Sequence, residues 1–391
     1  MAKRIILCFD GTWNTPAEKF AGLRALHARF ETLGARGDEA LRRALDAIDP
    51  GPDAVETNVC RLYRSIRRLA PGEVAPDSMG QIKWYDAGVG TSWYDRLAGG
   101  TFGLGLSRNI REGYHFLAKH WEPGDEVYVF GFSRGAYTAR SLVGMIRNCW
   151  LLPPGAIDGG PHEGTILDAY ELYRTRDDSA DSQHARAFRK QHGARSIHIK
   201  FLGVWDTVGA LGIPVQSFDA FNRARYEFHD TELSAIVQNA YHAIAVDEHR
   251  KPYAPTLWDP KAKPSQTLEQ RWFIGAHCDV GGGYEDRRLS DVTLAWMQAK
   301  AQGCGLVLHP EGVPRLRPED AQAGIVADSF GAFLGGLFQL FQERHFRPVG
   351  TTPFGQEAVH PTVFERMRHD PGYRPGNKGL RDFETIADGM V

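Results

Sequence analysis

Residues 125–148 have the sequence DEVYVFGFSRGAYTARSLVGMIRN, and this stretch decides the fold. Residues 126–130 combine β-branched and aromatic side chains without a helical period, which predicts a short buried strand. After the turn GFSRG, apolar side chains recur at helical spacing, which predicts a helix. The two glycines of the turn, Gly131 and Gly135, would let strand and helix approach closely because neither residue carries a Cβ atom.

A serine lies in the middle of this turn and is the first candidate for a catalytic residue. A strand, the pattern G-x-S-x-G and a helix together predict the nucleophile elbow of an α/β-hydrolase, in which the sharp turn lifts Ser133 Oγ above the sheet. The N–H of the next residue, Arg134, would then help to bind an oxyanion. The alternative is a glycine-rich turn with a solvated serine, since the bare pattern arises easily in a chain with 43 glycines. The flanking strand and helix favour the enzyme.

A second candidate for oxyanion binding follows the first predicted strand, residues 5–9. Asp10, Gly11 and Thr12 come directly after it, and the N–H of Gly11 or Thr12 would face an oxyanion beside the serine. The Asp10 carboxylate could also accept a hydrogen bond from its own backbone in an Asx turn, and the two interpretations are compatible. A phosphatase-type D-x-D-G-T strand end is disfavoured, because Cys8 stands where that pattern has its nucleophilic carboxylate.

The predicted acid and base follow two later strands. Residues 197–205 predict an apolar strand that ends in Asp206, where an α/β-hydrolase can place its acid; alternatively, Asp206 caps the next turn or helix. Residues 271–276 predict a short strand, followed by His277 and soon after by three glycines, a setting that suits a mobile general base. Ser133, Asp206 and His277 occur in the α/β-hydrolase order Ser…Asp…His.

Other titratable side chains compete for these roles. Asp279 is the second-choice acid, although it lies very close to His277 along the chain. Residues 241–258 predict a helix followed by a proline-bounded loop, and they contain three rival candidates. These are His242, Asp247 and His249. A helical histidine near a carboxylate is more often a surface or core partner than a catalyst, so we favour the set of Ser133, Asp206 and His277.

Composition favours a soluble globular protein with a hydrophobic core. The 391 residues are 42% hydrophobic and 24% charged, which is ordinary for a soluble protein. The formal net charge of −2 supplies no global field for nucleic acid, so no nucleic-acid partner is expected. The five cysteines are scattered, which predicts reduced thiols rather than a disulfide framework or a zinc site. Acyl transfer to a serine needs no metal and no organic cofactor, and we expect neither.

The sequence contains no recognisable targeting segment. The apolar run at residues 5–9 is too short for a signal peptide, and no apolar stretch reaches the roughly 18 residues of a transmembrane helix. We therefore expect a protein that is cytoplasmic as made, with any export by a secretion system that needs no cleaved signal.

The expected architecture is an α/β fold with an α/β-hydrolase-like, mostly parallel central sheet flanked by helices and carrying helical cap insertions. Residues 1–300 would form the catalytic domain, with a helical insertion at 17–55 and a cap insertion at 151–196. Residues 301–391 would form a C-terminal helical extension that packs on the same domain. Within it, residues 325–346 carry phenylalanines at helical spacing, which favours a core helix over a lipid-facing lid helix.

Taken together, these motifs resemble a known family. The chain is similar to the α/β-hydrolase domain, formerly of unknown function, that forms the catalytic part of the first family of type VI secretion lipase effectors. The matching stretches follow the family's order through most of residues 3–295. They are FDGTWN (9–14), TNV (57–59), GVGT (88–91), GFSRGAYTARSL (131–142), GVWDTVGALG (203–212), DEHR (247–250) and GAHCDVGGGY (275–284).

The resemblance implies an esterase or phospholipase, most simply of the A type, with a catalytic triad of Ser133, Asp206 and His277. Its substrate would be a phospholipid or another ester, which allows a peripheral contact with a membrane. The resemblance also allows a secretion or immunity partner. Two alternatives stay open, namely a general carboxylesterase that acts on small or polymeric esters and a non-catalytic binding module.

Overall fold

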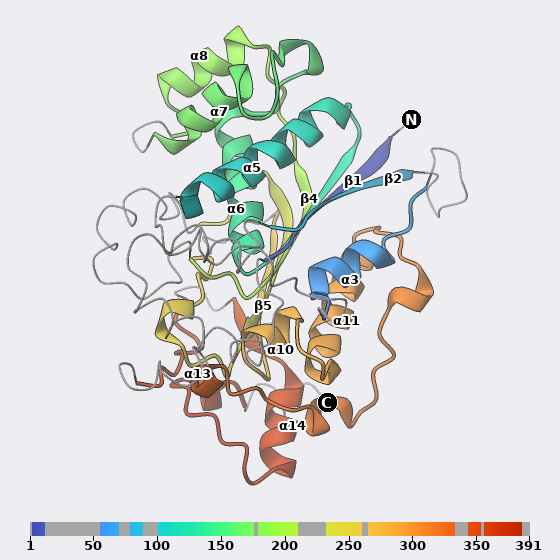
Figure 1. The fold of residues 1–391 in the computed structure, drawn as a ribbon, viewed down its shortest axis with the longest axis vertical. Coiled ribbons are helices and arrows are strands. Elements are labelled where there is room, and N and C mark those ends of the chain that lie inside the picture. Colours follow the sequence, from blue (N-terminus) through green and yellow to red (C-terminus); the bar gives the residue numbers. More distant parts are fainter. Residues whose placement is uncertain are drawn as a thin grey trace, which may run out of the picture.

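A computed structural model describes most of the chain (Figure 1). The described residues are 2–11, 55–69, 79–88, 101–175, 179–209, 232–259, 265–332, 343–352 and 356–384. Of the predicted helical insertion at 17–55, all but its last residue lies outside these stretches, as does Thr12.

The centre of the molecule is a seven-stranded sheet with the order β2-β1-β3-β4-β5-β6-β7. Every neighbouring pair of strands is parallel. The strands are β1 Lys3–Phe9, β2 Gly80–Asp86, β3 Glu126–Phe132, β4 Ile199–Trp205, β5 Val237–Ala245, β6 Thr267–Phe273 and β7 Glu357–Val359. The predicted α/β fold with a parallel central sheet flanked by helices is therefore confirmed.

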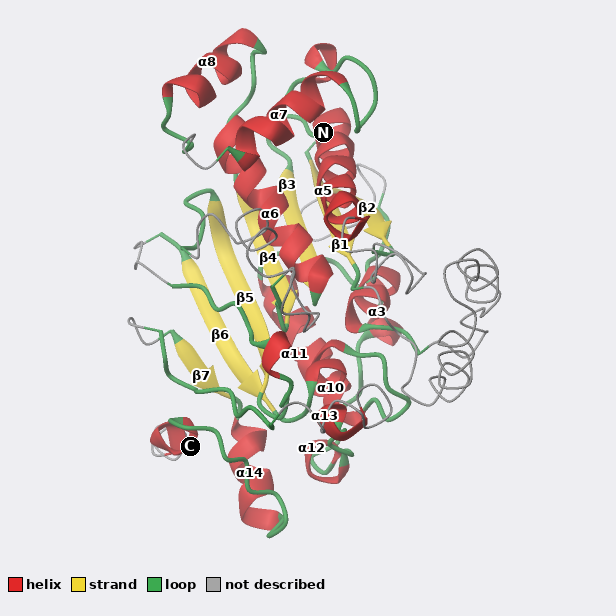
Figure 2. Cartoon of the chain, turned by 60° about the vertical axis from the view of Figure 1, so that its left-hand side comes forward, coloured by secondary structure: helices red, strands yellow, loops and turns green. Residues whose placement is uncertain are grey.

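Helices cover both faces of this sheet (Figure 2). The helices are α3 Asn58–Ser65, α5 Thr101–His120, α6 Arg134–Cys149, α7 Gly164–Arg174, α8 Gln183–Gln191, α10 His277–Gly281, α11 Arg288–Gly303, α12 Asp320–Ala323, α13 Ser329–Ala332 and α14 Pro361–His369. Short 3₁₀ helices lie at Pro154–Ala156, Lys251–Tyr253, Pro310–Gly312 and Leu380–Phe383.

Strand β1 shows why both faces are covered. Ile5 and Leu7 point into a core shared with α5, α6 and α7, whereas Ile6 and Cys8 point into a second core shared with α3, α11 and α14. Successive side chains of a strand alternate between faces, so the continuous apolar run Ile5–Phe9 must be buried on both.

One predicted element is wrong. Residues 241–258 were expected to begin with a helix, but β5 runs through Val237–Ala245 between β4 and β6. Its second half is buried throughout, with His242 fully buried. A strand covered on both faces loses the alternation of polar and apolar residues, so a short apolar run does not distinguish strand from helix, and its alanines have little strand preference.

Segment 151–196 connects the end of α6 to the start of β4 and includes α7 and α8. Both junctions lie at the amino-terminal end of the parallel strands, and Figure 1 shows α7 and α8 gathered there. Ser133 follows the carboxyl end of β3. The described part of the expected cap insertion therefore lies away from the serine rather than over it.

The C-terminal segment is more than a helical extension. Strand β7 pairs with β6 and lengthens the sheet. Within the expected 325–346 helix, α13 spans only Ser329–Ala332, and residues 333–342 lie outside the described stretches. Phe330 is buried, whereas Ile325 is 65% and Phe346 44% exposed, so the described part of this segment has apolar side chains both in the core and in solvent.

Candidate active site

The turn between β3 and α6 has the backbone of a nucleophile elbow. Ser133 has φ 57° and ψ −118°, a conformation that residues with a side chain seldom adopt. Packing is so tight that a Cβ atom added at Gly131 would lie 2.4 Å from Gly135 O, and one added at Gly135 would lie 2.1 Å from Phe9 O. The expectation that glycine is needed at both positions therefore has a structural cause.

Replacing Gly135 by alanine is expected to lower the free energy of unfolding by about 3 kcal/mol, because the new methyl group meets backbone atoms of β1 that cannot rotate away. Gly303→Ala is the matched control, since a Cβ there meets nothing within 4 Å. Chemical denaturation of both variants measures the difference. Equal stabilities would contradict the close approach.

Three side chains singled out in the sequence meet at the carboxyl edge of the sheet. Ser133 Oγ lies 2.8 Å from His277 Nε2, and His277 Nδ1 lies 2.6 Å from Asp206 Oδ2. They follow β3, β6 and β4 and are 7%, 4% and 0% exposed, in the order serine, histidine, aspartate. A hydroxyl bonded to an imidazole that is itself oriented by a carboxylate is the arrangement that activates a nucleophile.

The carboxylate of Asp206 is surrounded by donors. Oδ1 accepts the N–H of Ala245 at 3.0 Å and Arg347 Nη1 at 2.7 Å, and Oδ2 lies 3.1 Å from Arg347 Nη2. Burial alone would raise the pKa of Asp206, but the Arg347 guanidinium and the His277 imidazole hold it well below its usual range. An ionised carboxylate only accepts hydrogen bonds, so Nδ1 of His277 carries a proton and Nε2 faces the serine as an acceptor.

The start of α10, where His277 lies, is held by a second buried ion pair. Glu248 Oε2 accepts the backbone N–H of His277 at 3.3 Å and lies 2.8 Å from Arg250 Nη2. The His277 ring packs against Phe132 at 4.7 Å and Tyr253 at 5.3 Å between ring centroids. Burial lowers the pKa of His277, although the bond to Asp206 works in the opposite direction.

This shift predicts how activity depends on pH. A general base must be neutral, and the pKa of His277 lies below the roughly 6.5 of a free imidazole, so kcat/KM should fall only as the pH drops through that lower value. We expect the acid limb of the pH profile, measured with a soluble ester that does not itself titrate, to have its midpoint below about 6.5. A midpoint at neutral pH or higher would contradict a desolvated imidazole.

A comparison with known protein families identifies the family of this chain. Residues 3–300 match the model of the catalytic domain of Tle1-like phospholipase effectors of the type VI secretion system. The chain belongs to this family. Ser133, Asp206 and His277 fall inside the matched range, whereas Arg347 lies beyond it.

Individual relatives of this Tle1-like chain are distant. An uncharacterized protein of Saccharomyces cerevisiae, YEL023C, is 29% identical over 281 residues, which cover 66% of this chain and 33% of the yeast protein. A solved structure of the Tle1 effector bound to the VgrG spike is 21% identical, covers 73% of this chain and 52% of that one, and has a TM-score of 0.37. An uncharacterized protein from Pseudomonas aeruginosa is 18% identical, with coverages of 88% and 51% and a TM-score of 0.41. The chain thus spans about a third to a half of these relatives, and the fold assignment rests on the sheet itself.

The loop after β1 is organised by Asp10. Its Oδ1 accepts the N–H of Gly11 at 2.7 Å, and its Oδ2 accepts the hydroxyls of Thr57 at 2.5 Å and Tyr85 at 2.6 Å. The Asp10 carboxylate thus accepts a hydrogen bond from the backbone of the next residue, one position earlier than in an Asx turn. Gly11 lies against Ser133, since an added Cβ would be 3.0 Å from Ser133 Cβ, and its N–H donates to Asp10 Oδ1.

Asp279 and His242, two rivals for the catalytic roles, have other partners. Asp279 Oδ2 accepts the N–H groups of Ala276 and Ala327, both at 2.9 Å, so it fastens two loops and does not orient His277. His242 lies within β5, where its Nε2 accepts the N–H of Thr207 at 3.1 Å. Burial lowers its pKa to about 3, which makes it a neutral core histidine.

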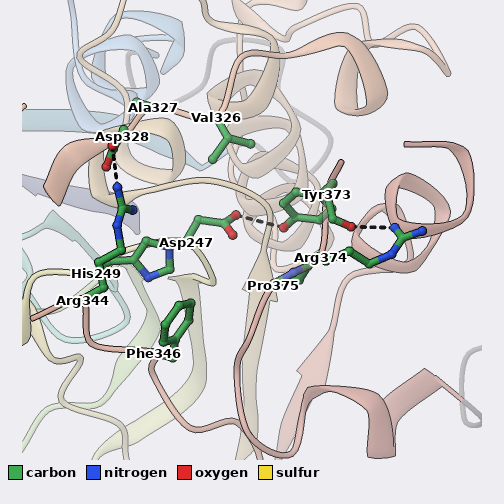
Figure 3. Close-up of a pocket in the computed structure, with 10 residues that line it drawn as sticks. All are labelled: Asp247, His249, Val326, Ala327, Asp328, Arg344, Phe346, Tyr373, Arg374 and Pro375. Carbon is green, nitrogen blue, oxygen red and sulfur yellow. Dashed lines mark hydrogen bonds and ion pairs between the residues drawn. The ribbon is translucent and has the colours of Figure 1, made fainter. Parts of the chain in front are cut away.

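The remaining rivals, Asp247 and His249, line a cavity of about 270 Å³ (Figure 3). Asp247 Oδ2 accepts the N–H of Gly275 at 2.7 Å and the hydroxyl of Tyr373 at 2.9 Å. The His249 ring lies 4.8 Å from that of Phe346. Both residues therefore build the wall of this cavity rather than the hydrogen-bonded chain that leads to Ser133.

Two further findings bear on cofactors and membranes. Within the described stretches, no group of three or more His, Cys, Asp or Glu side chains is arranged to hold a metal ion, and all five cysteines are free thiols. None of the helices in the described part of the chain is both long enough and apolar enough to cross a membrane.

Arg347, whose guanidinium is hydrogen-bonded to the candidate acid, was not among the residues predicted from the sequence. It follows a segment that was expected to be a continuous helix, and no motif surrounds it. Only an indirect indication of such a residue exists in the sequence. A buried triad carboxylate needs more hydrogen-bond donors than one imidazole supplies.

Proposed function

We propose that this chain is a serine hydrolase that cleaves carboxylic esters of phospholipids, with A-type specificity, through an acyl-enzyme on Ser133. The observation that carries the proposal is the hydrogen-bonded chain from Ser133 through His277 to Asp206. Membership in a family of phospholipase effectors supports the choice of lipid as the substrate.

The first half of the reaction forms the acyl-enzyme. Ser133 Oγ attacks the carbonyl carbon of the ester while His277 Nε2 accepts the hydroxyl proton. Asp206 holds the other ring nitrogen and stabilises the imidazolium that forms. When the tetrahedral intermediate collapses, the bond to the leaving oxygen breaks and His277 donates its proton to the departing alcohol, which for a phospholipid is the lyso product.

The second half releases the fatty acid. Water attacks the acyl carbon as His277 accepts one of its protons, and the same proton returns to Ser133 Oγ when the acyl bond breaks. In both halves the oxyanion would be bound by the N–H of Arg134 and by an N–H of the loop at residues 11–12. Because the Gly11 N–H donates to Asp10 in this structure, we propose the Arg134 N–H as the principal donor to the oxyanion. Arg134 is the first residue of α6, and the N–H groups in the first turn of a helix point out of its end.

The family also supports proposals about partners. Since its members are effectors of type VI secretion, we propose that the chain is exported by that system and meets a secretion partner on the way. A phospholipid substrate requires a peripheral contact with a membrane surface, and a lipase made inside a cell calls for an immunity partner there.

Hydrolysis of phospholipid vesicles and of p-nitrophenyl butyrate by the same preparations tests the function. The wild type, Ser133→Ala and a control, Ser182→Ala, would be compared; Ser182 caps α8 at the far end of the sheet. Fatty-acid release by the wild type and the control, but not by Ser133→Ala, is the expected result. Butyrate hydrolysis alone would refute the phospholipid substrate but keep the triad. Neither activity in folded protein would refute both.

A further inference from the structure

Arg347 is among the most deeply buried charged side chains of the described residues, with 1% exposure. Its guanidinium faces both oxygens of the Asp206 carboxylate, at 2.7 and 3.1 Å. The remaining hydrogen bonds run to main-chain carbonyls, from Nη1 to Ala245 at 2.8 Å and from Nη2 to Tyr253. The guanidinium therefore contacts the triad acid, the last residue of β5 and the 3₁₀ helix that follows β5.

Stability alone is a weak reason for such a pair. Desolvating an arginine and a carboxylate costs about as much as their attraction returns, and well-packed apolar residues often serve the fold equally well. The pair also lies at a strained position, since Asp206 has φ 35°. A buried bidentate contact does, however, fix the plane of a carboxylate, because the planar fork of arginine matches it in two places.

We propose that Arg347 is a positioning residue of the active site, which clamps Asp206 so that Oδ2 faces His277 and whose charge offsets that of the carboxylate. The inference rests on the proposed function, because it assigns a role within the same site. Arg347 does not touch the substrate. It acts through Asp206 on the orientation of the imidazole and on the pH range in which the imidazole is neutral.

The chain around Arg347 is held in place for this role. The side chain of Asn377 donates from Nδ2 to Arg347 O at 2.9 Å and to Val246 O at 3.0 Å. Two residues earlier, the N–H of His345 donates to His249 O at 2.9 Å. The segment 343–352 is thus fastened beside the loop after β5. Arg347 lies beyond the family-matched range of 3–300, so this C-terminal segment would complete a site whose other members lie within that range.

Several charged groups surround His277 and must be considered together. Asp206 comes from the end of β4 and Arg347 from the C-terminal segment. Glu248 and Arg250 come from the loop after β5, where they neutralise one another at 2.8 Å, and the Tyr253 ring packs on the imidazole. The side-chain hydrogen bonds of Arg347 run to Asp206 and not to Glu248 or Arg250, so we expect a shift in the titration of His277 in an Arg347 variant to report mainly on the Asp206–Arg347 pair.

Two substitutions separate charge from geometry. Arg347→Gln keeps a donor but loses the charge, so the uncompensated Asp206 carboxylate should raise the pKa of His277 by about one unit or more. Arg347→Lys keeps the charge but loses the fork, so His277 should titrate nearly as in the wild type. Both should lower kcat with little change in KM, by about 10²-fold for Gln, because a misplaced base slows the chemical step.

Arg189 supplies the matched control. It is also buried, and its guanidinium donates to the carbonyls of Asn148 at 2.9 Å and Ala180 at 2.7 Å, away from the triad. Arg189→Gln and Arg189→Lys are expected to leave kcat and the pH profile unchanged. Thermal unfolding of all four variants shows how much of any effect comes from stability.

The test combines kinetics with p-nitrophenyl butyrate and an NMR titration of His277 in protein that carries Ser133→Ala. The NMR titration needs no substrate, so it decides on Arg347 even if the wild type hydrolyses no ester and the proposed function fails. A raised pKa in the Gln variant but not in the Lys variant supports the clamp. Wild-type titration and kcat in a folded Gln variant overturn it; if that variant does not fold, wild-type kcat in a folded Lys variant overturns it.

Discussion

Replacing Ser133 by alanine is expected to lower the turnover number for ester hydrolysis by about 10⁶-fold, because the acyl group then has no side chain to which it can be transferred. His277→Ala should cost about as much, since the hydroxyl 2.8 Å away loses the base that removes its proton. The double variant should be no slower than either single one. The serine and the histidine act as a unit, so removing either one already removes most of the advantage of the covalent route.

Steady-state rates with p-nitrophenyl butyrate measure these losses, with unfolding curves to show that the variants remain folded. Because alanine removes only one oxygen atom from Ser133, the Ser133→Ala protein should keep its stability. Turnover within tenfold of the wild type in folded Ser133→Ala would contradict the assignment. A double variant much slower than both single variants would contradict a shared mechanism.

Asp206→Asn should lower the turnover number by about 10⁴-fold, because an amide no longer holds the productive tautomer of His277. It should also lower the free energy of unfolding by about 3–5 kcal/mol, since the buried Arg347 guanidinium loses its counter-charge. The second effect separates this site from a triad in which the acid has no cationic partner. Turnover and chemical denaturation, measured on the same preparation, report the two effects.

The matched control for this substitution is Asp279→Asn. Asp279 bonds to two backbone N–H groups through Oδ2, and an asparagine can still accept such bonds through its carbonyl oxygen. We expect its turnover to stay within tenfold of the wild type. If Asp279→Asn were the slower variant, the roles of the two aspartates would have to be exchanged.

The candidate triad could be found from sequence because each member follows a predictable strand. In a parallel sheet the carboxyl ends of the strands meet at one edge, so side chains placed just after three strands converge there even though they are far apart in the chain. The pattern around Ser133 identified the first strand, and the order serine, aspartate, histidine selected the other two. Glycine spacing at 131 and 135 also followed from local crowding.

Other features depended on contacts between distant segments. Strand β5 was mistaken for a helix because a strand buried on both faces has no alternation to reveal it. Gly11 was proposed as an oxyanion donor, but whether its N–H is available depends on Asp10, whose orientation is set by Thr57 and Tyr85. Arg347 carries no local pattern at all. Its role arises only when the C-terminal segment packs beside β5, and periodicity along the chain does not report such packing.

The central claim is that Ser133 is a nucleophile activated by His277, and covalent labelling tests it most directly. The wild type, Ser133→Ala and His277→Ala would be incubated with a fluorophosphonate, and the adduct would be located by peptide mass spectrometry. We predict one adduct per chain on Ser133 in the wild type, none at that position in Ser133→Ala, and strongly slowed labelling in His277→Ala. Folded wild-type protein that stays unlabelled, or that is labelled at another residue, would contradict the claim.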